Sequence, residues 1–409
     1  MKRILSAIVR TVAAVLLLTL LVLTIFSVSP IYKFQEPEPF AGPDIYNPYY
    51  GLSGQWKKSC FHTHSRVLGP LNECALPADS VVADYRKFGY DIVGISNHNT
   101  VSRNPLDSTI RIYEHGYNVF KFHKLVFNPL RVRRFDHIIP FMVSQKQWQY
   151  DLLARTSDFI MMNHPDRTLF ATPRSMRLLS GYRLMEADVS GTDCLKWDEA
   201  LSAGHYCHNL SSDDCHDTRN HLKIARRCSW LDTPSTHYED IAPVLLQGRF
   251  YSMRIPDFGS GDWQAKYEGN AHLPGIVDIG VSADTVYVRL SEPARIEARG
   301  QGHVLLGEVQ GDALSIKMEE EDPYVRFTAF FDNGATLFTN AFARYDPAKA
   351  DSPFVAGTHR VNILLTVLWN AFLLLFAILL LKWLKAVLPH KKKESRPTVE
   401  QLRFRGIVP

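Results

Sequence analysis

Metal-binding side chains recur in the first half of this 409-residue chain, each time directly after a short hydrophobic run. His98 follows the run at residues 91–96, and His164 follows the run at residues 158–162. The same arrangement holds for His62 with His64, for Glu186, and for Asp214 with His216. Imidazole and carboxylate groups in one site suit Zn, Mn or Fe. Because such groups meet at one ion only when the preceding strands lie side by side, the pattern predicts a metallohydrolase.

Two of these motifs place their side chains two residues apart. In an extended strand, residues i and i+2 point to the same face, so His62 and His64 can reach one ion, as can Asp214 and His216. Either pair alone also fits an ordinary protein surface. The prediction therefore depends on the motifs occurring together: ten of the 16 histidines lie between residues 62 and 216.

A helix–strand unit recurs between residues 56 and 256 and is suited to position these motifs. In one unit, residues 77–88 have an apolar helical face, Gly89 follows as a helix stop signal, and residues 92–95 form the next strand. Alternating helices and strands with short links indicate a parallel sheet covered by helices. About six or seven such units favour a closed (β/α) barrel, in which reactive groups gather at the C-terminal ends of the strands.

The sequence pattern changes after about residue 270. Residues 277–281 and 286–290 alternate apolar and polar side chains, and similar stretches continue to residue 340. Asp332-Asn333-Gly334 is a typical hairpin turn. We therefore predict a small antiparallel β-sandwich domain over residues 270–346, with a supporting role.

Two long apolar runs lie near the ends of the chain. Residues 11–28 are uncharged, and residues 361–381 form a second run, so each is near the length needed to cross a bilayer. A cleaved signal peptide is the alternative for the first run, although its apolar region would be shorter. We predict transmembrane helices over residues 4–28 and 361–384.

The charges beside these runs indicate the orientation of the chain. Basic residues precede the first run and follow the second: Lys2, Arg3, Arg10, Lys382, Lys385 and Lys391 to Lys393. The positive-inside bias then places both termini in the cytoplasm, with a basic cytoplasmic tail over residues 385–409. The intervening part lies on the outer, periplasmic side of the cytoplasmic membrane. The net charge of +4 comes from these tails, so we expect the lipid bilayer as a partner and no nucleic acid.

The six cysteines all fall in the part expected outside the cytoplasm, where disulfides are permitted. A Cys60–Cys74 disulfide would close a small loop around the first histidine pair. Buried free thiols are the alternative.

The order of the motifs resembles that of the polymerase and histidinol phosphatase (PHP) family of metallophosphoesterases. The resemblance covers residues 56–256 and is carried by His62-Thr63-His64-Ser65, residues 88–100, Tyr113-Glu114, His123, His164-Pro165 and residues 212–217. It implies a distorted (β/α)7 barrel, here over residues 50–258. It also implies two or three bound divalent ions (Zn, Mn or Fe) and hydrolysis of a phosphate ester.

The resemblance also implies a set of ligands for each ion. The first ion would be held by His62, His64, Glu114 and Asp214, and the second by Glu114, His123 and His164. The third would be held by His98, His216 and one ligand after the first motif. The chain departs from the family at Asn97, where an Asp is usual, and in that last ligand, which is either Asn72 or Glu73. We therefore expect two firm metal sites.

The expected reaction uses a hydroxide held between two ions as the nucleophile. Glu114 and Asp214 are the predicted catalytic carboxylates. Arg167 and Arg219 each follow a predicted histidine ligand by three residues, so either can clamp a phosphate or remain solvated. Glu186 is expected to orient a ligand. Structural or surface roles are expected for His115, His205 and Cys215.

These observations predict a membrane-anchored phosphoesterase outside the cytoplasm. Its proximity to the bilayer favours a phosphorylated lipid headgroup or envelope polymer as substrate. Two alternatives remain: an inactive PHP-like binding or sensing domain, and a metal-dependent hydrolase of a non-phosphate bond.

Overall fold

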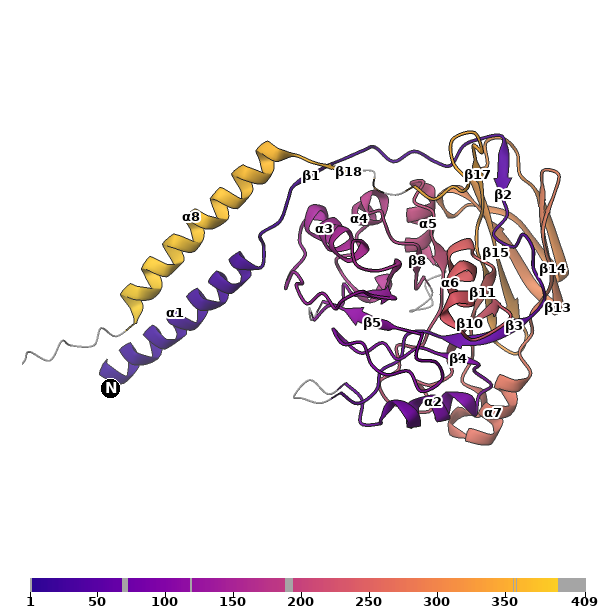
Figure 1. Ribbon diagram of the computed structural model, residues 1–409, viewed down its shortest axis with the longest axis horizontal. Helices are drawn as coiled ribbons and strands as arrows, with labels where there is room; N and C mark the ends of the chain where they lie inside the picture. The colour runs from indigo at the N-terminus through magenta and orange to yellow at the C-terminus, as the bar shows by residue number, and fades with distance from the viewer. Residues whose placement is uncertain are drawn as a thin grey trace, which may run out of the picture. The chain divides into compact units, whose positions relative to one another are not determined.

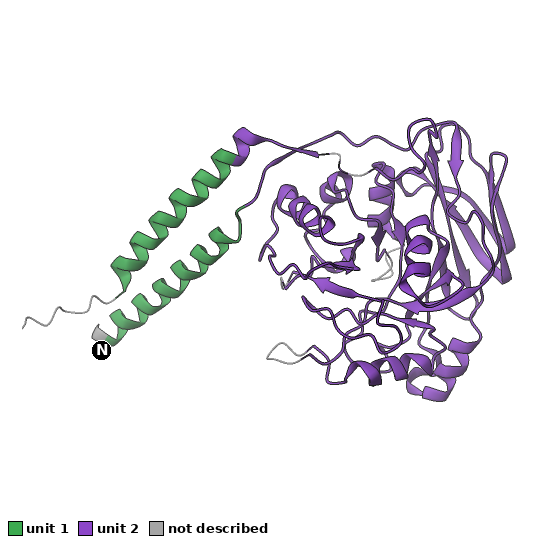
Figure 2. Cartoon of the chain, in the orientation of Figure 1, with its two compact units in different colours: residues 1–28, 367–409 green, residues 29–366 purple. Residues whose placement is uncertain are grey.

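The computed structural model describes residues 2–67, 73–117, 120–187, 194–355, 357 and 359–388. The chain forms two compact units (Figure 2): residues 1–28 with 367–409, and residues 29–366. We call them unit 1 and unit 2.

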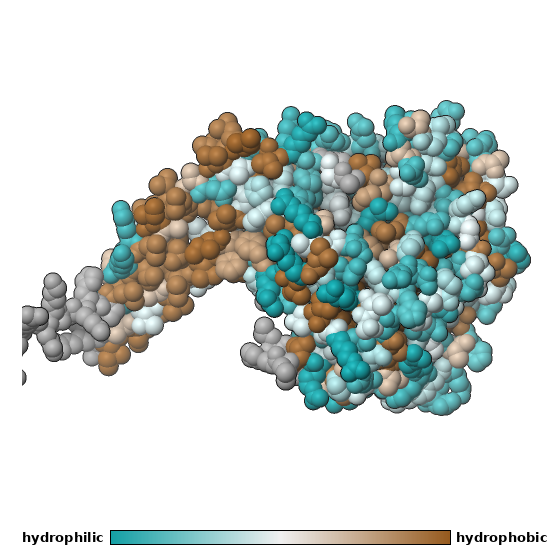
Figure 3. Space-filling model, in the orientation of Figure 1, coloured by the Kyte–Doolittle hydropathy of each residue, from teal (hydrophilic) through white to brown (hydrophobic). Residues whose placement is uncertain are grey.

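Unit 1 contains α1 (Lys2–Ile25) and most of α8 (Ile363–Val387) (Figure 1). Their segments Ile4–Ile25 and Ile363–Val387 are long and apolar enough to cross a bilayer. A helix in the core of a soluble protein would be mostly buried. In these two helices, only 6% and 11% of the residues in the most apolar stretch are buried. Figure 3 shows both helices brown along their length, while unit 2 is largely teal and white. Length, composition and exposure thus agree with the predicted membrane-spanning segments.

Unit 2 contains an 11-stranded sheet whose main path is β12-β13-β15-β16-β11-β10-β3-β4. Its strands are β3 (Trp56–Cys60), β4 (Ile92–Val93), β10 (Arg227–Asp232), β11 (Phe250–Arg254), β12 (Ile276–Ser282), β13 (Thr285–Arg299), β14 (Leu305–Lys317), β15 (Tyr324–Phe331), β16 (Thr336–Thr339), β17 (Phe342–Tyr345) and β2 (Asp44–Tyr46). Among them, β3 and β4 are parallel and the other pairs are antiparallel.

A second sheet has five strands in sequence order, β5 (Ile112–His115), β6 (Lys124–Phe127), β7 (Phe159–Met162), β8 (Leu184–Met185) and β9 (His208–Asn209). The pairs β5–β6 and β6–β7 are antiparallel, and β7–β8–β9 are parallel. A separate antiparallel pair joins β1 (Tyr32–Phe34) to β18 (His359–Val361).

The helices of unit 2 lie between these strands in the chain. They are α2 (Ala78–Arg86), α3 (Val143–Ala154), α4 (Pro173–Leu178), α5 (Leu195–Ser202), α6 (Tyr238–Gln247), α7 (Trp263–Ala271) and the short 3-10 helices η1 (Pro165–Arg167), η2 (Phe258–Gly261) and η3 (Gln301–His303). α3 packs on β7, and α6 packs on β10. Gly248 ends α6 with a φ of 93°, as expected for a glycine stop signal.

The mixed α/β architecture is confirmed, but the predicted closed (β/α)7 barrel is not. In the described part of the chain, β3 to β9 pair within two sheets, and β5 and β6 form an antiparallel pair with no helix between them. Two isolated parallel bridges, Thr63–Cys215 and His98–Glu114, link the sheets. The hydrophobic runs therefore mark the strands correctly. Pairing between distant segments determines whether neighbouring strands are parallel and whether the sheet closes into a barrel.

The segment predicted as a separate β-sandwich continues the larger sheet. β11 pairs with β16, with Tyr251 opposite Thr339, so no break divides the two regions. One hydrophobic core contains Tyr85 of α2, Met253 of β11 and Phe327 of β15. Residues 286–290 and 294–298, which look like two strands in the sequence, are one 15-residue strand with a register shift between Arg289 and Ala294.

Candidate metal centre

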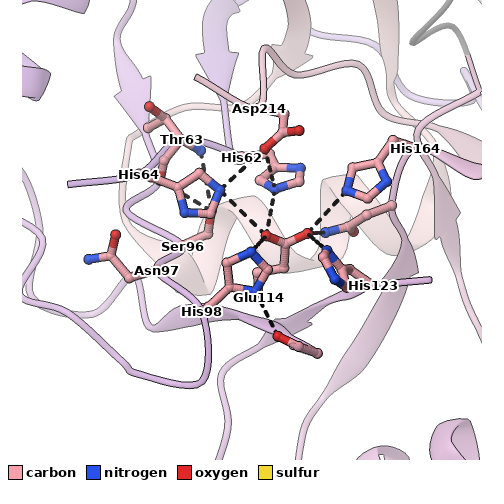
Figure 4. Close-up of polar contacts among 12 residues, drawn as sticks. His62, Thr63, His64, Ser96, Asn97, His98, Glu114, His123, His164 and Asp214 are labelled. Carbon is pink, nitrogen blue, oxygen red and sulfur yellow. Dashed lines mark hydrogen bonds and ion pairs between the residues drawn. The ribbon is translucent and has the colours of Figure 1, made fainter. Parts of the chain in front are cut away.

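Glu114 lies at the centre of a cluster of imidazoles (Figure 4). Its side chain projects from β5 and is 1% exposed. The Oε2 atom lies 3.2 Å from His62 Nε2, 3.4 Å from His64 Nε2 and 2.9 Å from His98 Nε2. The Oε1 atom lies 3.2 Å from both His123 Nδ1 and His164 Nε2. Each carboxylate oxygen thus faces its own set of ring nitrogens.

Asp214 provides a second carboxylate on the side of His62 and His64. Its Oδ1 atom lies 3.3 Å from the Nε2 atoms of both histidines and 3.2 Å from His216 Nε2. The His216 ring stacks on His64, with centroids 4.0 Å apart. Ligand atoms of His62, His64, Glu114 and Asp214 lie within 4.8 Å of one another, so these four side chains could hold one ion.

Three further groups of donors adjoin the first. They are His98 with Glu114 and His123, His64 with Glu73 and His98, and His62 with His164 and Glu186. Glu73 Oε2 lies 2.8 Å from His64 Nδ1, and its Oε1 lies 3.7 Å from His98 Nε2. Of the two alternatives for the last ligand, Glu73 therefore lies at the cluster, while Asn72 falls outside the described residues.

Buried polar atoms in the cluster test whether an ion fits. His62 Nε2, His64 Nε2 and Glu114 Oε2 are buried, and both nitrogens contact the oxygen as ion pairs, yet none of the three atoms forms a hydrogen bond within the described residues. A buried polar atom without a partner is costly. These atoms nevertheless point toward one another, and nitrogen and carboxylate oxygen are suitable ligands for Zn, Mn or Fe. The donor set fits a divalent ion.

Backbone pairing brings the first and last motifs together. His62 and His64 lie just beyond the end of β3, and the His64 N–H donates to Cys215 O at 2.9 Å. The Asp214 N–H donates to His62 O, also at 2.9 Å. Side chains separated by about 150 positions therefore meet because these two segments form a parallel bridge.

Two of the candidate ligands occupy strained backbone conformations. His164 has a φ of 28° and Asp214 a φ of 52°, both in the region that favours glycine. Such conformations cost about 1–3 kcal/mol each and are typical of functional sites. Here they aim the two side chains at the cluster.

Glu186 and Asn163 contact candidate ligands and fix their positions. Glu186 Oε1 contacts His62 Nδ1 at 2.8 Å, and its Oε2 accepts a hydrogen bond from the His164 N–H at 3.0 Å. A carboxylate on Nδ1 fixes the tautomer that leaves Nε2 free for an ion. Asn163 Nδ2 donates to Glu114 Oε1 at 2.8 Å. The sequence gives no specific signal for Asn163 beyond its place directly before His164.

The charges of the cluster support one another. Burial disfavours ionisation of Glu114, but His62 and the other imidazoles outweigh it and hold the pKa of this carboxyl well below its usual range. Asp214 behaves in the same way, again chiefly through His62. Burial lowers the pKa of His64, but the contacts with Asp214 and Glu73 have the larger opposite effect and raise the pKa to about 9. Without an ion, the carboxylates are therefore charged and balanced by protonated imidazole.

The two predicted phosphate-binding arginines lie in different places. Arg167 Nη1 donates to Asp214 Oδ2 at 2.6 Å, and its side chain is 30% exposed, so it lies at the edge of the cluster. Arg219 is 62% exposed and pairs with Asp217 at 2.9 Å, and no contact links it to the cluster within the described residues. The structure thus does not bring Arg219 to the site, because the chain turns outward after His216.

Several other predicted residues lie outside the cluster. All six cysteines are free and buried, so of the two alternatives for Cys60 and Cys74 the structure has buried thiols and no disulfide. His115 contacts Phe135 O, and His205 contacts Arg177 O. Asn97 does not replace the family's Asp in the cluster. Its Oδ1 accepts from the Ser65 N–H, so it fixes the loop after His64 instead.

Comparisons with known proteins add a distant structural likeness. No family model matches the chain, and no curated protein matches it. One solved structure with similarity is a two-domain protein containing a predicted PHP-like metal-dependent phosphoesterase from Bacteroides vulgatus ATCC 8482. The match covers 77% of this chain and 92% of that one, with 11% identity and a TM-score of 0.32.

Proposed function

We propose that this chain is a membrane-anchored, metal-dependent phosphoesterase. The observation that carries the proposal is the arrangement around Glu114, where buried nitrogen and oxygen atoms face one another without hydrogen-bond partners among the described residues. Because donor groups lie on both sides of this carboxylate, we infer at least two ions. We assign His62, His64, Glu114 and Asp214 to the first ion, and Glu114, His123 and His164 to the second. His98, which the resemblance places at the third ion, groups with Glu114 and His123, so we assign it to the second ion as well. His216 and Glu73 extend the set toward a third.

The residues around these positions have distinct tasks. When bound, a pair of divalent ions supplies an activated water and neutralises phosphoryl oxygens. Arg167 lies at the solvent edge, where its guanidinium can donate to a phosphate oxygen. Glu186 and Asn163 keep the imidazoles and Glu114 in place, so that the donor atoms need not reorganise during the reaction.

We further propose that α1 and α8 anchor the chain in the cytoplasmic membrane. Both termini then lie in the cytoplasm, and unit 2 lies on the outer side. The substrate would be a phosphate ester of a lipid headgroup or of an envelope polymer, since such a compound lies within reach of a tethered domain.

The purified full-length chain tests this function. Bound metal per chain is measured, followed by hydrolysis of an aryl phosphate monoester and a diester. We compare wild type with His164→Ala, Asp214→Ala and the matched control His272→Ala, which changes an exposed histidine of the α7 C-terminus. Turnover should be lost in the first two variants and kept in the control.

Three other outcomes would contradict the proposal. Turnover that survives in His164→Ala and Asp214→Ala would place the chemistry elsewhere. A folded, metal-free and inert wild type would favour a binding module. Hydrolysis of carboxylic esters alone would favour attack at a carbonyl.

A further inference from the structure

An exposed apolar surface lies on unit 2, which we call the apolar rim. It consists of Phe120, Phe141, Leu169 and Phe170. Leu169 is 86% exposed, Phe141 71% and Phe120 36%. The Phe170 ring joins the two exposed phenylalanines, with centroid distances of 5.2 Å to Phe120 and 6.0 Å to Phe141, and Leu169 directly precedes it in the chain. Contiguous exposed apolar surface marks an interaction site.

The apolar rim adjoins the metal centre. Phe120 stands three residues before His123, and Leu169 stands two residues after Arg167. The rings of His123 and His164 lie 5.5 Å apart, and Figure 4 shows them on the same side of the cluster. The two loops that deliver these candidate ligands therefore also carry Phe120, Leu169 and Phe170, while Phe141 precedes α3.

The loop that carries Leu169 and Phe170 is held firmly from inside. Lys146 of α3 donates to Phe170 O and to Ser175 Oγ, both at 2.7 Å. Lys196 of α5 donates to Pro165 O at 2.6 Å. Two lysines thus fix the backbone of this loop. The exposure of Leu169 is therefore a property of a well-held loop conformation.

The apolar rim is also close to the place where the chain leaves unit 2 for its two apolar helices. The Tyr32 N–H donates to Ser144 Oγ at 3.0 Å, and the Tyr32 hydroxyl donates to Asp151 at 2.6 Å. Both acceptors belong to α3, and Ser144 is three residues from Phe141. Three residues of chain span at most about 11 Å. The rim and the exit of the chain thus share one end of α3.

The segments that lead from unit 2 to the two helices are bonded to each other and carry two exposed basic side chains. The Ile31 N–H donates to Thr366 Oγ1 in the first turn of α8 at 2.9 Å, so both connections to the helices leave together. Lys33 and Arg360 stand opposite each other in the β1–β18 pair, and both are exposed. Basic side chains beside membrane helices attract anionic headgroups.

The segment that supplies part of the rim has the same charge. Between residues 117 and 141 the sequence contains a single acid, Asp136, which is buried. Lys121, Arg131 and Arg134 are exposed in this segment. Exposed aromatic and aliphatic side chains among basic ones are typical of surfaces that lie in a membrane interface.

We propose that the apolar rim is a membrane-docking surface. It rests on the bilayer that holds α1 and α8 and brings the mouth of the metal centre to the lipid surface. The inference about the substrate rests on the proposed function: a lipid phosphate ester would reach the metal centre while its apolar part stays in the bilayer. The docking itself does not require turnover, so the two can fail separately.

Fluorescence quenching in nanodiscs tests the docking with the full-length chain. Leu169→Cys and Val277→Cys are labelled with an environment-sensitive fluorophore. The wild type, treated in the same way, measures the background labelling of the six buried cysteines. Val277 is a matched control because it is apolar, 52% exposed and on β12, at the far end of the larger sheet. With nitroxide on the lipid acyl chains, we expect about threefold stronger quenching at position 169 than at 277.

Two results would overturn the docking surface. One is equal quenching at positions 169 and 277. The other is that a second copy of the chain covers position 169. This would appear as energy transfer between chains that carry different labels at position 169 in one nanodisc, measured without nitroxide.

Kinetics test whether docking presents the substrate. In the double variant Phe141→Ser and Leu169→Ser, the rate on a lipid-embedded phosphate ester relative to a soluble aryl phosphate should fall about tenfold. Val277→Ser should leave this ratio unchanged. An unchanged ratio in the double variant would overturn the presentation of a lipid substrate. A wild type that is inert on both compounds would instead refute the proposed function and leave the quenching result standing.

Discussion

Glu186 shows how a residue outside the donor set can determine its geometry. One of its oxygens holds His62 Nδ1, and the other holds the backbone of His164. Two candidate ligands from different strands are thereby fixed by one buried carboxylate, which is 1% exposed. Glu186 is a positioning residue, because its contacts are with candidate ligands.

The change Glu186→Gln should therefore weaken metal binding without removing the site. Loss of one anionic partner of a metal-binding histidine typically costs about 10–100-fold in affinity. Competition with a chromogenic chelator measures the affinity, and turnover should return when excess metal is supplied. Glu268→Gln, on the exposed face of α7, is the matched control. Activity lost beyond rescue by metal would contradict a positioning role.

Position after hydrophobic runs predicted His62, His64, His98, His164, Asp214 and His216, whereas Glu114 and His123 were expected only from the resemblance to the PHP family. The eight predicted metal ligands are brought together, as the contacts of Glu114 and Asp214 show. Arg167 and Arg219 show the limit of this reasoning. Both stand three residues after a histidine, yet the loop after His164 keeps Arg167 at Asp214, while the loop after His216 turns Arg219 to solvent.

At the scale of elements, α5 and β15 are joined by a buried charge pair. Arg326 of β15 donates through Nε to Asp198 Oδ1 at 2.8 Å, and both side chains are 1% exposed. His303 of η3 also contacts Asp198. Burial opposes the charge on Asp198, but Arg326 outweighs it and holds the pKa below its ordinary value of 3.8.

The change Asp198→Asn should destabilise unit 2, because it removes the carboxylate that balances the charge of the buried Arg326. Removing one partner of a buried pair costs about 3–5 kcal/mol. Denaturant unfolding of the detergent-solubilised chain measures the loss at neutral pH. Since the folded pKa lies below 3.8, the difference should be complete above that pH and shrink as the pH falls further. Asp217→Asn, on the surface, should leave the midpoint unchanged. A small, pH-independent difference would contradict this account.

Strand pairing explains which elements could be predicted. The run at residues 92–95 and the helix before it appear as β4 and α2, because local hydrophobic period and the Gly89 stop signal determine them. The antiparallel turn from β5 into β6 and the joining of β11 to β16 depend on contacts between distant segments. Alternating side chains look the same in a free sandwich and in a continued sheet.

At the scale of the whole molecule, the two apolar helices and the charges beside them predict a two-pass topology. Epitope tags at both termini should resist protease added outside intact cells, while unit 2 should be cleaved or labelled from outside. Cells opened by detergent provide the control for tag accessibility. A tag exposed in intact cells would contradict the orientation derived from Lys2, Arg3 and Arg10 before the first helix.

The proposed function depends most on a multi-ion centre around Glu114. Anomalous diffraction from crystals grown with Mn or Zn, recorded on both sides of the metal edge, tests it directly. We expect at least two peaks, one among His62, His64 and Asp214 and one beside His98 and His123, with Glu114 between them. Well-ordered side chains in these positions with no anomalous peak would contradict it.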